Sequence, residues 1–264
     1  MIQFLPSRSV ALALGQFEIH WYGIMYMIGF LIGLWLLPKL LQYRKLTLSE
    51  RQKESLFLCV FLGVLFGGRI GYVFFYGGTF YLEHPAEIFA VWHGGMSSHG
   101  GFLGVFFALL YFAKKNHIKF FALLDVLVVP IAIGLALGRL GNLINAELYG
   151  TVTNLPWAVS FPNVEGLRHP TQVYAMLKDV FIAAVCFLHL RSSKGSTKRV
   201  GETTSVFLVL YSLLRFIVEF FRDQQQEPIA MLGILLSRGQ LLTIPLFILG
   251  VLFYVRRHRA GVWG

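Results

Sequence analysis

Long apolar runs alternate with short polar segments along the whole chain. A transmembrane helix needs about 20 mostly apolar residues, and seven runs come close to that length. The third run is weak because of its glycines, and the seventh because of its length. The pattern predicts an all-α fold, a polytopic membrane bundle of seven transmembrane helices in a single integral-membrane domain, residues 1–264. The runs are residues 19–37, 56–76, 94–113, 120–137, 171–190, 203–221 and 239–255.

The composition agrees with a membrane protein. The chain is 56% apolar and 14% charged, whereas about a quarter of the residues of a soluble domain are charged. The mean hydropathy is +0.65. Cys59 and Cys186 each lie inside an apolar run, which predicts free thiols and not a disulfide. A net charge of +10 would suggest nucleic acid in a soluble protein, but here membrane topology explains it, and no nucleic-acid partner is predicted.

Basic residues are concentrated on alternate loops, whereas loop 77–93 contains no Lys or Arg. By the positive-inside rule the basic loops lie in the cytoplasm. The N-terminus is therefore expected outside and the C-terminus inside, as an odd number of spans requires. Residues 138–150 are then expected at the outer, periplasmic face of a bacterial inner membrane. The basic loop residues are Lys39, Arg44, Lys45, Arg51 and Lys53, then Lys114, Lys115 and Lys119, then Arg191, Lys194, Lys198 and Arg199, and finally Arg256, Arg257 and Arg259.

A cluster of polar residues and glycines lies in GRLGNLINAELYG, residues 138–150, directly after the fourth run. Arg139, Asn142 and Asn145 recur at i, i+3 and i+6, so a helix would place Arg139 and Asn142 on one face. Glu147 follows. Arginine binds a phosphodiester through two parallel hydrogen bonds, and asparagine can orient the remaining oxygens. The alternative is an interfacial anchor that extends Arg139 to water, but an anchor needs no cluster of polar neighbours.

The sixth run carries a second charged group. Arg215, Glu219 and Arg222 are spaced i, i+4 and i+7, on one stripe of a helix. This spacing fits an ion pair that orients Arg215 toward a ligand, and it fits equally a structural pair that fastens the helix to a neighbour. In the fifth run Lys178 and Asp179 are adjacent, and adjacent helical residues are not expected to face each other.

Residues 93–101, HGGMSSHGG, place His99 between serine and glycines before the third run. A histidine is the usual general base near neutral pH, and a structural histidine in a tight turn is the equal alternative. His93 and His99 have no third ligand nearby, so no metal site is predicted. Tyr22 and Tyr26 lie one turn apart, and their position alone indicates interfacial tyrosines.

Six motifs together resemble the prolipoprotein diacylglyceryl transferase family. They cover nearly the whole chain, and GRLGNLINAELYG resembles the family signature. Two departures are visible: Tyr174 is followed by Ala175 where the family usually has glutamate, and loop 150–168 is short. The motifs are HWYGIMY (20–26), FGGRIGYVFFY (66–76), GGMSSHGG (94–101), GRLGNLINAELYG (138–150), RHPTQVY (168–174) and RFIVEFFR (215–222).

The resemblance implies transfer of the diacylglyceryl group of phosphatidylglycerol to the lipobox cysteine of a preprolipoprotein, with release of glycerol phosphate. It implies a reaction that needs no cofactor, and a protein with seven spans and a periplasmic N-terminus. It implies a phosphatidylglycerol site and catalytic residues on the outer side of the membrane. The implied lipid-binding residues are Arg139, Asn142, Asn145, Glu147 and Arg215, and the implied catalytic residues are His99, Arg139, Arg215, Glu219 and Tyr22.

Two rival classes are weighed against this interpretation. A seven-span transporter or receptor for an anionic solute would use Arg139 and Arg215 for recognition, and paired repeats would be expected in it. The repeated Gly-Arg-x-Gly at 68–71 and 138–141 is the one sign of such a repeat, and four residues are too few to establish it. An intramembrane serine protease would need a G-x-S-x-G segment, and the sequence contains none.

Overall fold

The computed structural model describes residues 2–3, 9–14, 17–91, 94–196, 199–224, 229–231 and 234–262. The chain forms two compact units. The large unit comprises Met1–Lys45 and Leu124–Gly264, and the small unit comprises Leu46–Leu123. Each unit is described by itself.

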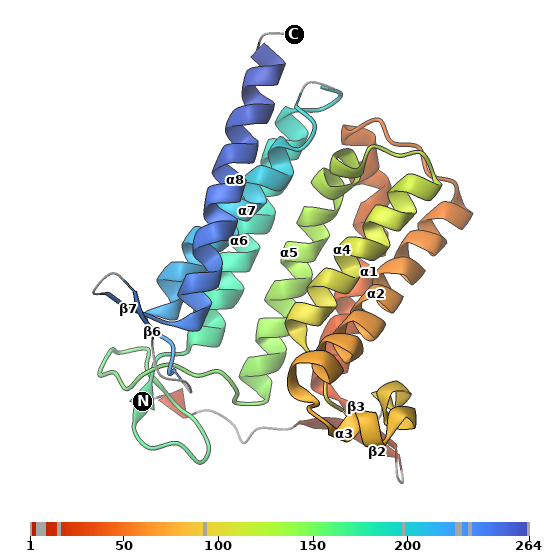
Figure 1. Ribbon diagram of the computed structural model, residues 1–264. Coiled ribbons are helices and arrows are strands. Elements are labelled where there is room, and N and C mark those ends of the chain that lie inside the picture. The colour runs from red at the N-terminus through yellow and green to blue at the C-terminus, as the bar shows by residue number, and fades with distance from the viewer. Residues whose placement is uncertain are drawn as a thin grey trace. The chain divides into compact units, whose positions relative to one another are not determined.

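Each of the seven apolar runs coincides with a long helix, which confirms the helical class (Figure 1). The fourth of these helices continues to Ile144, seven residues beyond the predicted end at Leu137. The long helices are α1 (Trp21–Tyr43), α2 (Glu50–Tyr76), α4 (Ser98–Lys115), α5 (Phe120–Ile144), α6 (Thr171–Ser192), α7 (Glu202–Glu219) and α8 (Arg238–Val262).

Short elements occupy the connections between these helices. Strand β1 pairs in parallel with β4, and β4 pairs antiparallel with β5, while β2–β3 and β6–β7 are hairpins. The all-α prediction therefore omits these small strands, although the helices carry the fold. The short elements are β1 (Ile2–Gln3), β2 (Val10–Leu14), β3 (Phe17–His20), α3 (Phe80–Glu83), the 3₁₀-helix η1 (Pro85–Phe89), β4 (Val159–Ser160), β5 (Leu167–Arg168), β6 (Ile229–Met231) and β7 (Ile234–Leu236).

Among the described residues, five helices are long and apolar enough to cross a membrane: α1, α2, α5, α6 and α8. Helix α4 has polar ends, since it begins with Ser-His and finishes with two lysines. Helix α7 carries Glu202, Arg215 and Glu219 within 18 residues. The expectation that the seventh run is among the weakest is wrong, because α8 has 25 residues. The weaker helices are those of the third and sixth runs.

The distribution of side chains is that of a membrane protein. Large apolar side chains point outward, with Trp35 78% exposed and Phe74 80% exposed. Polar side chains are buried, and Asp125, Thr203 and Ser205 are each 0% exposed. Soluble proteins rarely expose such large apolar surfaces, whereas lipid favours them and leaves the polar groups inside the bundle.

The small unit is built on close packing of α2 against α4 (Figure 1). Glycines face each other where the helices meet. A Cβ on Gly67 would lie 2.5 Å from the carbonyl oxygen of Gly100, and one on Gly104 would lie 2.1 Å from that of Gly63. Small residues allow helix backbones to approach in lipid, where packing replaces the hydrophobic effect as the source of association.

Replacing Gly104 by alanine is expected to destabilise the protein by about 1–3 kcal/mol, because the added methyl must push two backbones apart. Gly101→Ala on the same helix is the matched control, since its Cβ would meet its nearest neighbour at an ordinary 3.8 Å. Thermal unfolding of the purified proteins in detergent measures both. Equal unfolding temperatures for the two variants would contradict this account of the α2–α4 interface.

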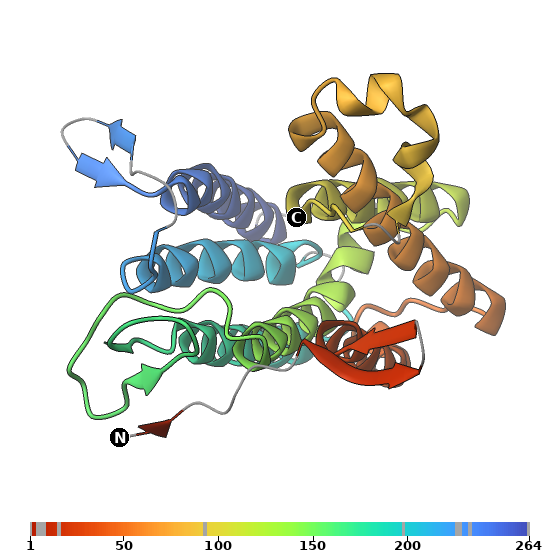
Figure 2. The same cartoon turned by 90° about the horizontal axis from the view of Figure 1, so that it is seen from below.

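In the large unit α7 packs against both α6 and α8 (Figures 1 and 2). Helix α8 begins with a capping box, in which Ser237 N donates to Gln240 Oε1 and Gln240 N donates to Ser237 Oγ. Such reciprocal bonds satisfy backbone groups that a helix start leaves free. Because α7 packs against α8, the end of α7 lies beside the first turn of α8.

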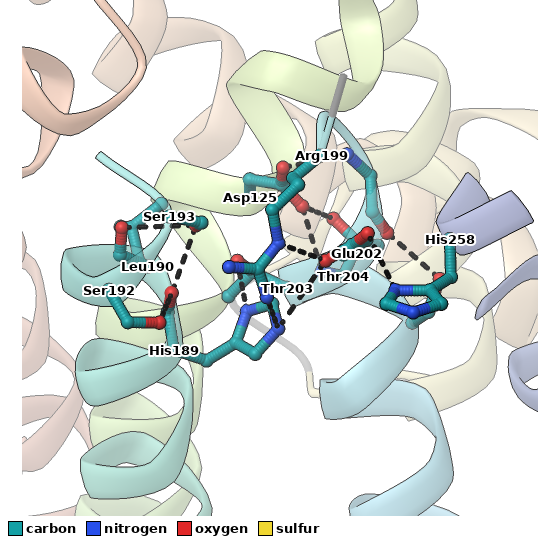
Figure 3. Close-up of polar contacts among 12 residues, drawn as sticks. Asp125, His189, Leu190, Ser192, Ser193, Arg199, Glu202, Thr203, Thr204 and His258 are labelled. Carbon is teal, nitrogen blue, oxygen red and sulfur yellow. Dashed lines mark hydrogen bonds and ion pairs between the residues drawn. The ribbon is translucent and has the colours of Figure 1, made fainter. Parts of the chain in front are cut away.

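A buried polar cluster joins α5, α6 and α7 (Figure 3). Arg44, the residue directly after α1, also belongs to it. Arg44 uses all its guanidinium N–H groups, donating to Asp125, to Ser193 Oγ and carbonyl oxygen, to Thr203 Oγ1 and to the Arg199 carbonyl. Asp125 also accepts from the amides of Gly201 and Thr204 and from the Thr204 hydroxyl. The sequence indicated Arg44 as a loop cation, but the folded chain buries it as a structural ion pair.

Glu202 forms the edge of this cluster. Its carboxylate lies 2.6 Å from Arg199 Nε, 3.7 Å from His189 Nε2 and 3.4 Å from His258 Nδ1. Figure 3 shows His258 approaching Glu202 from α8, with His189 on α6. The cluster therefore ties the start of α7 to helices on both of its sides.

Candidate functional site

The site begins at the end of α5, where the signature segment leaves the helix. Because α5 continues to Ile144, Arg139 and Asn142 lie on its last turns. Ala146 then adopts a left-handed conformation, with φ 56°. Its amide donates to the carbonyl oxygen of Leu143, and that of Glu147 donates to the carbonyl oxygen of Asn142. This is a Schellman helix end, and it turns Glu147 back toward the helix.

The polar residues of the segment form one hydrogen-bonded chain. Arg139 Nη1 donates to Asn142 Oδ1 over 3.4 Å. Asn142 Nδ2 donates to one oxygen of Glu147 and Asn145 Nδ2 to the other, each over 3.2 Å. The structure therefore brings together the four residues expected from this segment. Asn142 is 6% exposed, so the chain extends into the protein.

The first turn of α6 braces the loop that follows. Thr171 Oγ1 donates to the carbonyl oxygen of Leu148 over 2.7 Å, and Gln172 Nε2 donates to that of Glu147 over 2.6 Å. Leu148, like Ala146, has a positive φ, of 57°. Left-handed conformations cost non-glycine residues about 1–2 kcal/mol each, and such strain persists where surrounding contacts hold it. These two side chains supply the contacts.

The second charged group lies at the end of α7. Arg215 Nη2 lies 2.7 Å from Glu219 Oε2, and Arg222 Nη1 lies 3.8 Å from the same oxygen. Gln224 Nε2 donates to the other oxygen over 3.3 Å. A Cβ on Gly239, in the first turn of α8, would lie 2.6 Å from Glu219 Oε1. Glu219 is therefore enclosed, and it holds Arg215 by an ion pair.

Residues of both groups line one small cavity that is open to solvent. Three arginines line it, one from α5, one from α7 and one from the segment directly after α7. Ala175 lines it as well, at the position where the family resemblance leads one to expect glutamate. The cavity is thus strongly cationic. Its lining includes Arg139, Arg215, Arg222, Thr171, Gln172 and Ala175.

Arg139 differs from Arg44 in how its donors are used. A guanidinium has five N–H donors. Arg44 directs all of them to protein oxygens. Within the described part of the chain, Arg139 makes one hydrogen bond, and that bond is 3.4 Å long. Its remaining donors are available to an anion in the cavity. An interfacial anchor would not need donors that face a cavity.

Tyr22 contacts the same segment. A Cβ on Gly141 would lie 2.8 Å from Tyr22 Cδ2, so the ring packs directly on α5. The Tyr22 and Tyr26 hydroxyls lie 3.3 Å apart. The absence of a side chain at Gly141 makes room for this ring, which the sequence pattern alone assigns to the membrane interface.

His99 belongs to the small unit, in the first turn of α4, and is exposed. Ser97 caps this helix by accepting from Gly100 N over 3.3 Å. Arg69 holds the segment before it, donating to the carbonyl oxygens of Gly94 and Gly95. His93 lies outside the described residues, and the described residues contain no group of three or more potential metal ligands from His, Cys, Asp and Glu.

The Gly-Arg-x-Gly repeat does not produce two equivalent sites. Arg69 is 3% exposed and donates to four backbone carbonyl oxygens, those of Glu87, Ile88, Gly94 and Gly95. Arg139 instead lines a cavity. The repeat therefore gives a transporter interpretation no support.

Sequence reasoning missed several residues of the site. The sequence analysis places Arg222 on the helical stripe with Arg215 and Glu219 but not in the lipid site, and it gives Gln172 no role. The expectation for Lys178 and Asp179 is wrong, because Lys178 Nζ and Asp179 Oδ1 form a buried ion pair. Lys178 Nζ also lies 4.4 Å from the Tyr211 ring centre. Long side chains on adjacent helical residues can bend toward each other when a buried charge needs a partner.

A further layer holds the loop outside the cavity. Arg168 Nη1 lies 2.6 Å from Asp223 Oδ2, and the guanidinium lies over the Tyr149 ring. His169 Nδ1 lies 3.1 Å from the Tyr174 hydroxyl. Burial lowers the pKa of His169, which favours the neutral form of its ring. These contacts join the segment before α6 to the segment after α7 and to the loop that follows α5.

The prolipoprotein diacylglyceryl transferase family model matches residues 9–256. The chain belongs to this family. It is 42% identical over 265 residues to a phosphatidylglycerol–prolipoprotein diacylglyceryl transferase of Geobacter sulfurreducens, covering 99% of each chain. A protein of the same name from Polynucleobacter asymbioticus is 44% identical, with 97% of each chain covered. One from Vibrio atlanticus is 40% identical over 98% of this chain and 94% of its own. The family resemblance seen in the six motifs is thereby confirmed.

Proposed function

We propose that this protein transfers the diacylglyceryl group of phosphatidylglycerol to the lipobox cysteine of a preprolipoprotein. The relatives named for these two substrates support this over nearly the full chain. The observation that carries it is the partly buried Arg139, whose donors are mostly unused beside a cavity shared with Arg215 and Arg222. The charge and the hydrogen-bond donors of this lining suit a phosphodiester, which accepts hydrogen bonds and carries negative charge.

The chemistry follows from these charges. A thiol reacts as the thiolate, and its ordinary pKa is about 8.5. The thiolate attacks the glyceryl carbon beside the phosphate, so that an S–C bond forms as the C–O bond to phosphate breaks. The proton of the thiol passes to a base, and glycerol phosphate leaves with the bonding electron pair. Arg139 and Arg215 stabilise the negative charge that grows on the leaving phosphate, which lowers the barrier.

The neighbouring residues hold these two arginines. Asn142, Asn145 and Glu147 form the hydrogen-bonded chain that ends at Arg139, and Glu219 orients Arg215. Tyr22 packs on Gly141 and supports the same helix end. His99 is proposed as the base that receives the thiol proton, since it is exposed at the start of α4 and histidine suits this role near pH 7. No cofactor or metal is part of this reaction.

The direct test uses the purified protein, phosphatidylglycerol and a synthetic lipobox peptide. Mass spectrometry is expected to show the peptide heavier by one diacylglyceryl group, with the added mass on the cysteine. A peptide with serine in place of that cysteine is the control. If the peptide remains unmodified while the protein is folded, the proposed function is wrong.

We also propose the topology that the basic loops indicate. All seven long helices span the bacterial inner membrane, with the N-terminus outside and the C-terminus in the cytoplasm, and both units belong to one transferase domain. The active site then faces the periplasm, where a secreted substrate arrives. Five helices apolar enough to span and the outward-facing apolar side chains support the membrane location. For α4 and α7, packing against α2 and α8 offsets their lower hydropathy.

Cysteine labelling tests this orientation. In a chain with Cys59 and Cys186 replaced by alanine, a cysteine at the exposed Asn163 is expected to react with a membrane-impermeant thiol reagent in cells whose outer membrane is permeable to it. A cysteine at Ser196 is expected to react only after the inner membrane is opened. The reverse pattern would place the site in the cytoplasm and contradict the proposal. The background chain should keep its activity, because the reacting sulfur belongs to the substrate.

A further inference from the structure

We propose that Gln172 recognises the headgroup of the lipid by accepting a hydrogen bond from a headgroup hydroxyl, an inference that rests on the proposed function. Gln172 lies in the first turn of α6 and lines the cavity with the arginines. It is 2% exposed. Its Oε1 is buried and has no hydrogen-bond partner among the described residues.

The orientation of the amide is determined by its other contact. Nε2 lies 2.6 Å from the carbonyl oxygen of Glu147. A carbonyl oxygen accepts and never donates, so the atom facing it must be the amide nitrogen. Oε1 is therefore the free atom, and a buried acceptor without a partner costs more than an exposed one.

The chemistry of the cavity limits what can satisfy this acceptor. A phosphodiester has only acceptors, so it binds the arginines and cannot serve Gln172 Oε1. The ligand must therefore supply a donor close to its phosphate. An ammonium headgroup has donors but also a positive charge, which three arginines around one cavity disfavour. An uncharged hydroxyl beside a phosphate, as in a phosphoglycerol headgroup, meets both requirements.

Thr171 provides a matched comparison. It precedes Gln172, lines the same cavity and braces the same loop by donating to the Leu148 carbonyl oxygen. Its hydroxyl is already used in that bond. Loss of either side chain weakens the brace, but only Gln172 offers a spare buried amide oxygen. A structural role and a recognition role therefore have different consequences for lipid preference.

The test compares two lipids with the full-length protein and the lipobox peptide. One is phosphatidylglycerol, and the other is phosphatidylpropanol, which has the same number of headgroup carbons and no headgroup hydroxyl. The wild-type kcat/KM is expected to favour phosphatidylglycerol on the order of tenfold, the effect of one hydrogen bond. Gln172→Met is expected to lower kcat/KM for phosphatidylglycerol and to bring the preference close to one. Thr171→Val is expected to lower kcat/KM for both lipids by the same factor.

The outcomes separate the two proposals. No transfer from either lipid by the wild-type protein would overturn the proposed function, and this inference with it. Wild-type transfer with a preference that Gln172→Met leaves intact would overturn only the role of Gln172. A preference lost equally in Thr171→Val would overturn it too, since the brace and not the free acceptor would then set the preference. If Gln172→Met does not insert, Gln172→Leu is measured by the same ratio, which is independent of the amount of active protein.

Discussion

Arg139→Lys is expected to slow transfer on the order of tenfold to a hundredfold at equal membrane abundance. Lysine keeps the charge but loses the planar fork that binds two phosphate oxygens at once. One charge-assisted hydrogen bond contributes about 1.5–3 kcal/mol, which converts to that factor in rate. Arg139→Gln loses the charge as well and is expected to be slower still. The measurement is the rate of diacylglyceryl transfer from phosphatidylglycerol to the lipobox peptide.

The control for Arg139 is an arginine in the position of an ordinary anchor. Arg191 is exposed near the end of α6, and Arg191→Lys should leave the rate unchanged, since both side chains carry a charge on a long apolar stem. An Arg139→Lys variant as active as the wild type would show that no bidentate contact is made. Arg139 would then be an interfacial anchor, and the cavity would need another explanation.

Asp125→Ala is expected to destabilise the protein by about 3–5 kcal/mol, because it leaves the buried Arg44 without its carboxylate. The side chains of this pair are 1% and 0% exposed. Globular proteins have only about 5–15 kcal/mol of stability, so much of the variant should fail to accumulate. Thermal unfolding in detergent and the amount of protein in the membrane are the two measurements.

The comparison for Asp125 is an ion pair in water. Lys53 Nζ lies 2.6 Å from Glu50 Oε1, with the Glu50 side chain 85% exposed, and such pairs contribute about 0–1 kcal/mol. Glu50→Ala should therefore unfold close to the wild type. Asp125 and Arg139 are fourteen positions apart on α5, about 21 Å at 1.5 Å per residue. The Asp125→Ala molecules that do fold should thus retain their specific activity, and a variant as stable as Glu50→Ala would contradict the structural role.

The helices of this protein could be predicted from the sequence because they depend on local order. All seven apolar runs are helices, since the spacing of apolar residues and the length needed to cross lipid are properties of neighbouring residues. Two contacts could be predicted for the same reason, because the partners in each lie one helical turn apart. They are the hydrogen bond between Arg139 and Asn142 and the ion pair between Arg215 and Glu219. The helix ends were predicted less well, since α5 and α8 each continue seven residues beyond their apolar runs, to Ile144 and Val262.

Only the tertiary structure decided what each buried polar residue does. Arg44 and Asp125 are 81 residues apart in the chain, and nothing in either local pattern indicates the other. Gln172 joins the cavity because the first turn of α6 meets the loop after α5. The sequence by itself determined the helices, the basic residues on alternate loops and the positions of Arg139 and Arg215 in apolar helices. Whether an arginine is structural or binds a ligand depends on how many of its five donors already have partners, and that count depends on contacts between distant segments.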